Sequence, residues 1–286
     1  MFDSGILLID KPKGITSFDV IRKLRRITGI KKMGHTGTLD PFASGLLIIC
    51  IGKATRLSSK IITEEKEYTA TLKLGIKTDT GDMTGEVICI KELDGISVSK
   101  VEKLVPKILN IKQQIPPKFS ALKVNGKKAY ELARKKTDFQ LQPRAVEIKK
   151  FQFEEIAIPE LTYTALVSKG TYIRVLSETI GEMLKSCAVT TELRRISIGR
   201  ISIENACRME ELNDQNWQEY LYPMINLFTG SAQIEISEQE KDDFKMGRRF
   251  VVNKNDVNEV IVVCAGQVVG FGEVEDKILK PRTVII

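Results

Sequence analysis

Apolar residues recur along this chain with two different periods, and these predict both helices and strands. In GITSFDVIRKLRRITG they recur at helical spacing, Thr16 with Asp19 can cap the start, and Gly29 can end the element. Residues 46–51 are instead continuously apolar between two glycines, which is typical of a buried strand. The first sixty residues therefore mix one amphipathic helix with core strand.

The central part of the chain continues this mixture. EYTATLKLG alternates apolar and polar residues, which predicts a half-buried strand, followed by a turn at TDTGDMTGE and a returning strand over residues 87–90. The spacing predicts a helix over 97–110, and QIPPKFSALKVNGKKAYELARKK reads as a basic loop running into a second helix. Residues 161–167 alternate again, and a helical pattern follows Gly170 through residues 173–180.

From about Gln233 the pattern changes to short β-type pieces separated by Gly and Asn. We therefore expect an α+β fold, with a mixed, mainly antiparallel sheet flanked by helices in residues 1–230 and a small β-rich domain in residues 231–286.

Charge is unevenly distributed. Residues 1–60 hold 11 Lys or Arg against 4 Asp or Glu, and residues 100–150 hold 14 against 4, while the whole chain carries a net charge of only +7. Segregated basic blocks favour a polyanion partner, although solvated helix faces would account for the charge alone.

Other features limit the possible classes. Apolar runs such as Gly45 to Ile51 fall well short of a membrane helix, and the first residues resemble neither a signal peptide nor a transit peptide, so we expect a cytoplasmic protein without a membrane partner. The five cysteines are spread singly, without a C-x-x-C, and predict free thiols rather than a zinc site or a disulfide framework.

Asp40 is the most informative candidate for chemistry. It lies in GHTGTLDPFASG beside His35, the only histidine of the chain. The nearby GLLIICIGK has the wrong spacing for a phosphate loop, no G-x-S-x-G accompanies the histidine, and no G-x-G-x-x-G follows a first strand. Asp before Pro is also typical of an Asx turn, so spacing alone leaves the role of Asp40 open.

Several separated sequence motifs resemble the same protein family. GHTGTLDPFASG and GKATR, together with LLIDKPKGITS, EKEYTATLKLGIKTDTGD, IPPKFSALKVNGKKAYELAR and VSKGTYIRVLSETIGEMLK followed by TELRRISIG, occur in the order found in the TruB-type tRNA pseudouridine-55 synthases. The chain resembles that family from residue 6 to about residue 200. Its C-terminal β pieces are similar to the family's small PUA-like domain in position and type only.

The resemblance implies isomerisation of uridine in the TΨC loop of tRNA: the glycosidic bond is cleaved, the base rotates, and C5 is joined to C1′. No cofactor or metal is implied. By the match, Asp40 is the nucleophile, Arg174 the ion-pair partner that keeps a buried carboxylate charged, and Tyr68 the active-site tyrosine that stacks on the base and acts as a general base. Without the resemblance, Arg174 reads equally as a surface charge and Tyr68 as a core residue of a strand.

The remaining implied residues concern substrate binding. The target uridine must be flipped out of the loop, and His35 corresponds to the histidine that takes up the displaced stacking. Asp82 resembles a further polar contact, Tyr172 and Leu193 pocket walls, and Lys11 with Pro12 a pair that supports the catalytic loop.

The expected partner is the T-arm stem-loop of tRNA, bound by a monomer through residues 16–32 and a basic clamp at about 112–150. Two alternatives stay open: a related enzyme acting on another RNA, including one directed by a guide RNA, and an RNA-binding module or tRNA-folding chaperone without chemistry.

Overall fold

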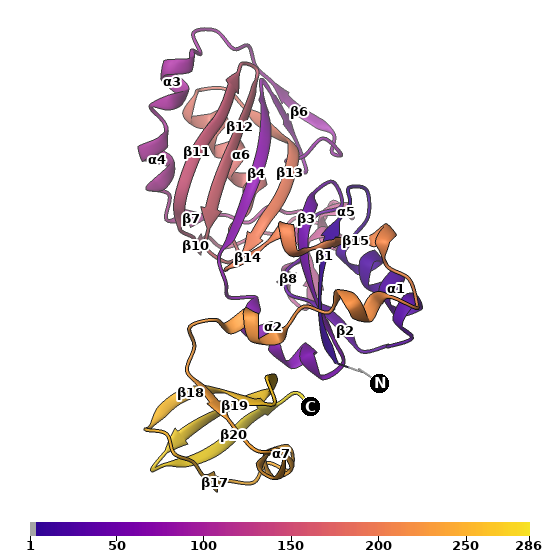
Figure 1. Cartoon of the computed structure of the whole chain (residues 1–286). Helices are drawn as coiled ribbons and strands as arrows, with labels where there is room; N and C mark the ends of the chain where they lie inside the picture. Colours follow the sequence, from indigo (N-terminus) through magenta and orange to yellow (C-terminus); the bar gives the residue numbers. More distant parts are fainter. Residues whose placement is uncertain (1–3) are drawn as a thin grey trace. The chain divides into compact units, whose positions relative to one another are not determined.

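The computed structural model describes residues 4–286, which separate into two compact units. Among the described residues, one unit comprises residues 4–39, Leu46–Ile62 and Arg200–Ile286, and the other comprises Asp40–Gly45 and Thr63–Gly199. Figure 1 labels the elements of both.

The second unit is built on antiparallel strands in the order β11-β12-β4-β13, which confirms the expected type of sheet. Helix α6 packs on β13 and β4, and α4 packs on β11 (Figure 1). The elements of this unit are β4 Lys66–Leu74, β5 Ile76–Thr78, β6 Val87–Ile90, α3 Val98–Glu102, α4 Val105–Leu109, β7 Gln113–Gln114, β8 Lys123–Val124, β9 Lys127–Lys128, α5 Ala129–Arg134, β10 Arg144–Ala145, β11 Ile148–Ala157, β12 Glu160–Val167, α6 Ile173–Met183 and β13 Ala188–Ile198.

The start of β3 (Ser44–Ile51) is fixed to β13 by a close approach of two backbones. Ser44 and Gly45 pair in parallel with Arg194 and Arg195. Gly45 has a φ of +107°, and a Cβ at this position would lie 2.3 Å from the backbone oxygen of Arg195. Only glycine satisfies both conditions, so the loop carrying Asp40 ends at a rigid point.

In the first unit, the expected helix is α1, Ser17–Thr28. Thr16 and Asp19 form the capping box, and Gly29 ends the helix in the left-handed conformation. Its apolar stripe packs in a core with β1 and β3. All eight residues of β3 are buried. The other elements before the C-terminal part are β1 Gly5–Lys11, β2 Met33–His35, η1 Gly52–Leu57, α2 Ser58–Ile61, β14 Ile201–Ser202, η2 Ile203–Asn205, β15 Cys207–Arg208, η3 Met209–Glu211, η4 Trp217–Tyr220 and η5 Met224–Phe228.

The C-terminal β pieces form a five-stranded sheet in the order β16-β18-β19-β20-β17. One apolar cluster of this region consists of residues between 232 and 286, which is what a small domain of its own would need. The expected boundary at residue 230 and the PUA-like assignment stay predictions. The elements are β16 Gln233–Glu235, α7 Glu238–Lys245, β17 Phe250–Val251, β18 Val257–Cys264, β19 Gln267–Glu275 and β20 Ile278–Val284.

The structure departs from the sequence-based expectations at two places. The helix expected over 97–110 is two short helices, α3 and α4, because Pro106 cannot supply the backbone hydrogen bond that would join them. Helix α7 was not expected at all, since Phe244 is its one buried residue and leaves no apolar stripe. Within residues 4–286, no helix is long and apolar enough to cross a membrane.

Candidate active site

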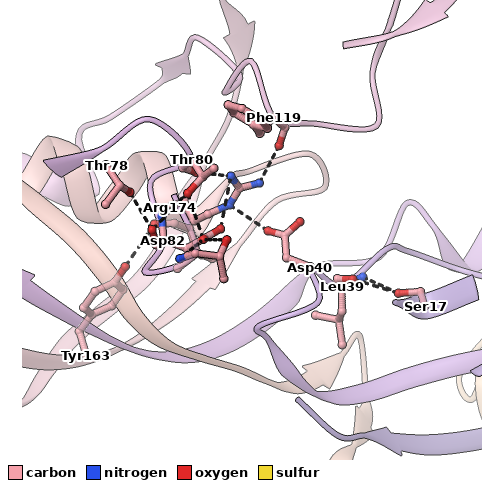
Figure 2. A network of polar contacts seen from close by, with 11 residues as sticks. Ser17, Leu39, Asp40, Thr78, Thr80, Asp82, Phe119, Tyr163 and Arg174 are labelled. Atoms are coloured by element: carbon pink, nitrogen blue, oxygen red, sulfur yellow. Dashed lines mark hydrogen bonds and ion pairs between the residues drawn. The ribbon is translucent and has the colours of Figure 1, made fainter. Parts of the chain in front are cut away.

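Asp40 lies in a tight turn directly before β3. Its backbone oxygen accepts a hydrogen bond from the backbone N–H of Ala43 at 3.1 Å. The preceding residue, Leu39, is held through its backbone by the hydroxyl of Ser17, which accepts from the N–H at 2.8 Å and donates to the carbonyl at 3.1 Å (Figure 2). The turn is thus made by the main chain, and the carboxylate is left available for another partner.

That partner is Arg174, in the first turn of α6. Its Nε lies 2.9 Å from Oδ2 of Asp40. Nη2 donates to the backbone oxygen of Phe119 at 2.9 Å, and Nη1 donates to the backbone oxygen of Thr80 (Figure 2). All three nitrogens of the guanidinium are therefore engaged, which fixes its plane as well as its position.

The pair is buried on one side only. The Arg174 side chain is 4% exposed, whereas the Asp40 side chain is 34% exposed. The expectation of a buried carboxylate is therefore wrong in part: the cation is enclosed and the carboxylate faces outward. A carboxylate in this position can meet a ligand while its charge is stabilised from behind.

Asp82 organises the loop that supplies one of these contacts. Its Oδ1 accepts from the hydroxyl of Thr80 at 3.0 Å and from the backbone N–H and the hydroxyl of Thr84. Its Oδ2 lies 4.0 Å from Nη1 of Arg174. Asp82 therefore joins the Asp40–Arg174 pair, but through the loop more than through direct contact.

Tyr172 lies two residues before Arg174, and its role as a pocket wall stays a prediction. It is the N-cap residue of α6. Burial raises the pKa of its phenol, and the charges of Arg174 and Asp40 act on it in opposite directions. The phenol therefore stays neutral at physiological pH and lies within electrostatic reach of the pair.

Tyr68 and Leu193 lie on neighbouring strands of the same unit. Tyr68 on β4 is opposite Arg195 of β13, and Leu193 is opposite Ala70. Both side chains are buried. In the part of the chain that the structure describes, no hydrogen bond joins Tyr68 to Asp40 or Arg174, so its role in chemistry stays a prediction.

His35 and Lys11 belong to the first unit. His35 ends β2, opposite Ile49 of β3, and its Nδ1 accepts a weak bond of 3.4 Å from the N–H of Gly37. Lys11 is fully buried, and its ammonium donates to the backbone oxygens of Pro12 and Ile15, both at 2.8 Å. Lys11 therefore braces the loop after β1, while the roles of both residues toward RNA stay predictions.

Three residues of the site were missed by sequence reasoning. Thr80 and Phe119 contribute backbone oxygens, which no pattern of residue types can reveal. The third is Gln114, whose buried side chain bonds to the backbone of Tyr172. Across residues 4–286, no three His, Cys, Asp or Glu side chains gather closely enough to hold a metal ion.

The sequence of the chain matches those of a known protein family. Residues 25–173 match the model of the TruB family pseudouridylate synthase N-terminal domain. The tRNA pseudouridine synthase B of Clostridium novyi (strain NT) is 44% identical over 289 residues, covering 99% of this chain and all of that protein. That of Aquifex aeolicus (strain VF5) is 36% identical, with 99% of each chain covered.

A solved structure agrees at the level of the fold. The crystal structure of a Cbf5-Nop10-Gar1 complex contains a chain that matches with a TM-score of 0.72 and 22% identity, over 99% of this chain and 85% of that one. With a family model covering half of the sequence and full-length relatives above 30% identity, the chain belongs to the TruB family of pseudouridylate synthases.

Proposed function

We propose that this protein is a tRNA pseudouridine synthase that isomerises a uridine of the T-arm, at position 55, to pseudouridine. The observation that carries the proposal is the ion pair between a partly exposed Asp40 and an enclosed Arg174. Relatives at 36% and 44% identity over nearly the whole chain are tRNA pseudouridine synthase B enzymes, which supports tRNA as the substrate.

The reaction asks little of the protein besides one nucleophile. The glycosidic bond between N1 and C1′ breaks, the base turns, and a bond from C5 to C1′ forms; the C5 hydrogen leaves to water and N1 gains a proton. Substrate and product are isomers, so no redox cofactor is needed. Asp40 attacks C1′ of the ribose or C6 of the base, and Arg174 stabilises the carboxylate before attack and after release.

The other residues have supporting roles in this proposal. Tyr68 stacks on the flipped base and takes a proton during the rearrangement, Tyr172 and Leu193 wall the pocket, and His35 fills the space that the base leaves in the RNA loop. Extrusion of the base costs a few kcal/mol, which contacts of this kind have to offset.

Two basic regions would bind the T-arm, namely residues 16–32 and the clamp at about 112–150. The outer face of α1 and the segment around α5 present exposed Lys and Arg side chains, which suit a phosphate backbone. We propose a monomer acting in the cytoplasm, without a guide RNA.

Tritium release tests this function. Wild-type protein incubated with an unmodified tRNA transcript labelled at C5 of uridine should release tritium, and Asp40→Asn should release none while still binding the tRNA. A T-arm minihelix should also react. Inactivity of the pure protein on both RNAs would favour a guided enzyme, and RNA-folding activity that survives Asp40→Asn would favour a chaperone.

A further inference from the structure

The segment between β7 and β10 is fastened to the start of α6, and the fastening residue is Gln114. Its amide oxygen accepts a hydrogen bond from the backbone N–H of Tyr172 at 3.0 Å. Its amide nitrogen donates to the backbone oxygen of the same residue at 3.4 Å. The side chain of Gln114 thus binds both backbone groups of Tyr172, whose oxygen also accepts from the N–H of Leu176 at 3.1 Å.

This arrangement is specific to a neutral amide. Gln114 is 6% exposed, so water does not replace lost partners easily. Tyr172 begins α6 without a side-chain cap of its own. A carboxylate could accept from its N–H but would turn a second acceptor toward its carbonyl. An apolar side chain would leave the N–H without a partner, while the carbonyl would keep only the bond from the N–H of Leu176 at 3.1 Å.

Tyr172 stands two residues before Arg174, so Gln114 sets the path of the backbone from which the guanidinium projects. The same segment contributes a second contact, because Phe119 accepts from Nη2 of Arg174 at 2.9 Å. Two residues of the segment, Gln114 and Phe119, therefore contact Arg174 or the backbone just before it.

The other end of the segment returns to the same place. Gln114 pairs directly with Arg144, and the backbone N–H of Val146 donates to the oxygen of Lys112 at 2.9 Å. Residues 115–143 thus form an excursion, which includes the basic stretch around α5, closed at its base next to Tyr172. A displacement of the excursion on RNA binding would therefore reach the start of α6 through Gln114, at its base, and through the oxygen of Phe119.

We propose that Gln114 is a positioning residue that, by holding the backbone at Tyr172, keeps Arg174 in place against Asp40 while residues 115–143 bind RNA. The inference rests on the proposed function, since it assigns the contact that preserves the geometry of the catalytic pair when tRNA is bound. It concerns the rate of the chemical step and not the affinity for tRNA.

Two variants test it. Gln114→Met removes both hydrogen bonds at similar volume, and Gln114→Glu keeps the acceptor alone. We expect the single-turnover rate at saturating tRNA to fall about tenfold to a hundredfold in Gln114→Met, with the Kd for tRNA changed by less than about twofold. Gln152→Met, which replaces an exposed glutamine of β11, is the matched control and should behave as wild type.

The pH profile of Gln114→Glu separates positioning from a general structural defect. A protonated carboxyl has one donor and one acceptor, as the amide does, and burial raises the pKa of a carboxyl. The rate of Gln114→Glu relative to wild type should therefore recover as the pH falls from about 8 to about 5.5. A misfolded variant would not recover in this way, so this profile also decides the matter if Gln114→Met fails to fold.

Three results would overturn the inference: an unchanged saturating rate in Gln114→Met, a loss that appears only in Kd, or a flat pH ratio for Gln114→Glu. Failure of the proposed function looks different, because the wild-type protein would then release no tritium under any condition, and both proposals would fall together.

Discussion

Arg174 holds Asp40 through one nitrogen, Nε, at 2.9 Å from Oδ2, while its other two nitrogens bind backbone oxygens. The arginine is therefore anchored to the protein main chain independently of the carboxylate. A ligand that approaches Asp40 meets a charge whose stabilising partner does not have to move, and this is the property that electrostatic catalysis requires.

Arg174→Lys should lower the single-turnover rate by about a hundredfold or more, although it keeps the positive charge. An ammonium has no planar fork, so it cannot serve Asp40, Thr80 and Phe119 together. Rapid-quench measurement at saturating tRNA tests this. Arg200→Lys, at an exposed arginine that binds the backbone oxygen of Thr229, should retain the wild-type rate; equal losses in the two variants would contradict the argument.

Asp82→Ala should lower the free energy of unfolding by about 1–3 kcal/mol, because it removes the buried acceptor of the N–H and hydroxyl of Thr84 and leaves the Thr80 hydroxyl only the backbone oxygen of residue 82. Asp82→Asn keeps an acceptor oxygen and should cost less. Urea denaturation of both variants measures the difference, with Asp94→Ala at an exposed loop as control. If both Asp82 variants matched wild type, the loop would not depend on this side chain.

Gly45→Ala should destabilise the protein by about 2–4 kcal/mol, or prevent its folding. The new Cβ would meet the backbone oxygen of Arg195 at 2.3 Å, in a conformation that disfavours side chains. Gly34→Ala offers the comparison, since nothing lies within 4 Å of its Cβ. Thermal unfolding of the two variants measures the difference. Equal midpoints would disprove the close approach of Gly45 to the backbone of Arg195.

Lys66 should make stability depend on alkaline pH. Burial, with a contribution from Arg195, lowers the pKa of its ammonium from 10.5 to about 8. Between these values the unfolded chain keeps a proton that the folded chain has released, so the free energy of unfolding rises with pH in this range.

The measurement compares wild type with Lys66→Met. The free energy of unfolding of wild type relative to this variant should rise by about 1–3 kcal/mol between pH 8 and pH 10.5 and stay flat below pH 7. A difference that is constant over the alkaline range would mean that Lys66 is not titrating there.

The basic clamp at about 112–150 should contribute to the affinity for tRNA and not to the chemical step. Alanine at the four exposed residues Lys127, Lys128, Arg134 and Lys135 should weaken tRNA binding and flatten its dependence on salt between about 50 and 200 mM. The same change at Lys91, Lys100, Lys103 and Lys107 is the control. Unchanged affinity and salt slope in the first set would show that the segment is not an RNA clamp.

The elements that sequence reasoning identified are those with local signals. The capping box and the terminal glycine of α1 are contained within fourteen residues, and β4 alternates without interruption. Strand β11 was missed because two register shifts break its alternation. Strand β13 was missed because its buried positions include Thr190 and Arg195, so its core face does not look apolar.

The candidate site was predictable only in part. Resemblance to known enzymes pointed to Asp40 and Arg174, and the structure confirms that they meet. Residue types alone could not predict a contact between two side chains so far apart in the sequence. The oxygens of Thr80 and Phe119 depend on how loops close, and the pairing of Gln114 with Tyr172 depends on where β7 ends.

The turn at Asp40 runs directly into a strand that is buried along its whole length and locked at Gly45 against β13. The backbone that carries the carboxylate is consequently anchored only a few residues away from it. The rotation that a nucleoside rearrangement requires would therefore be made by the base and its sugar, against a protein backbone that keeps its position.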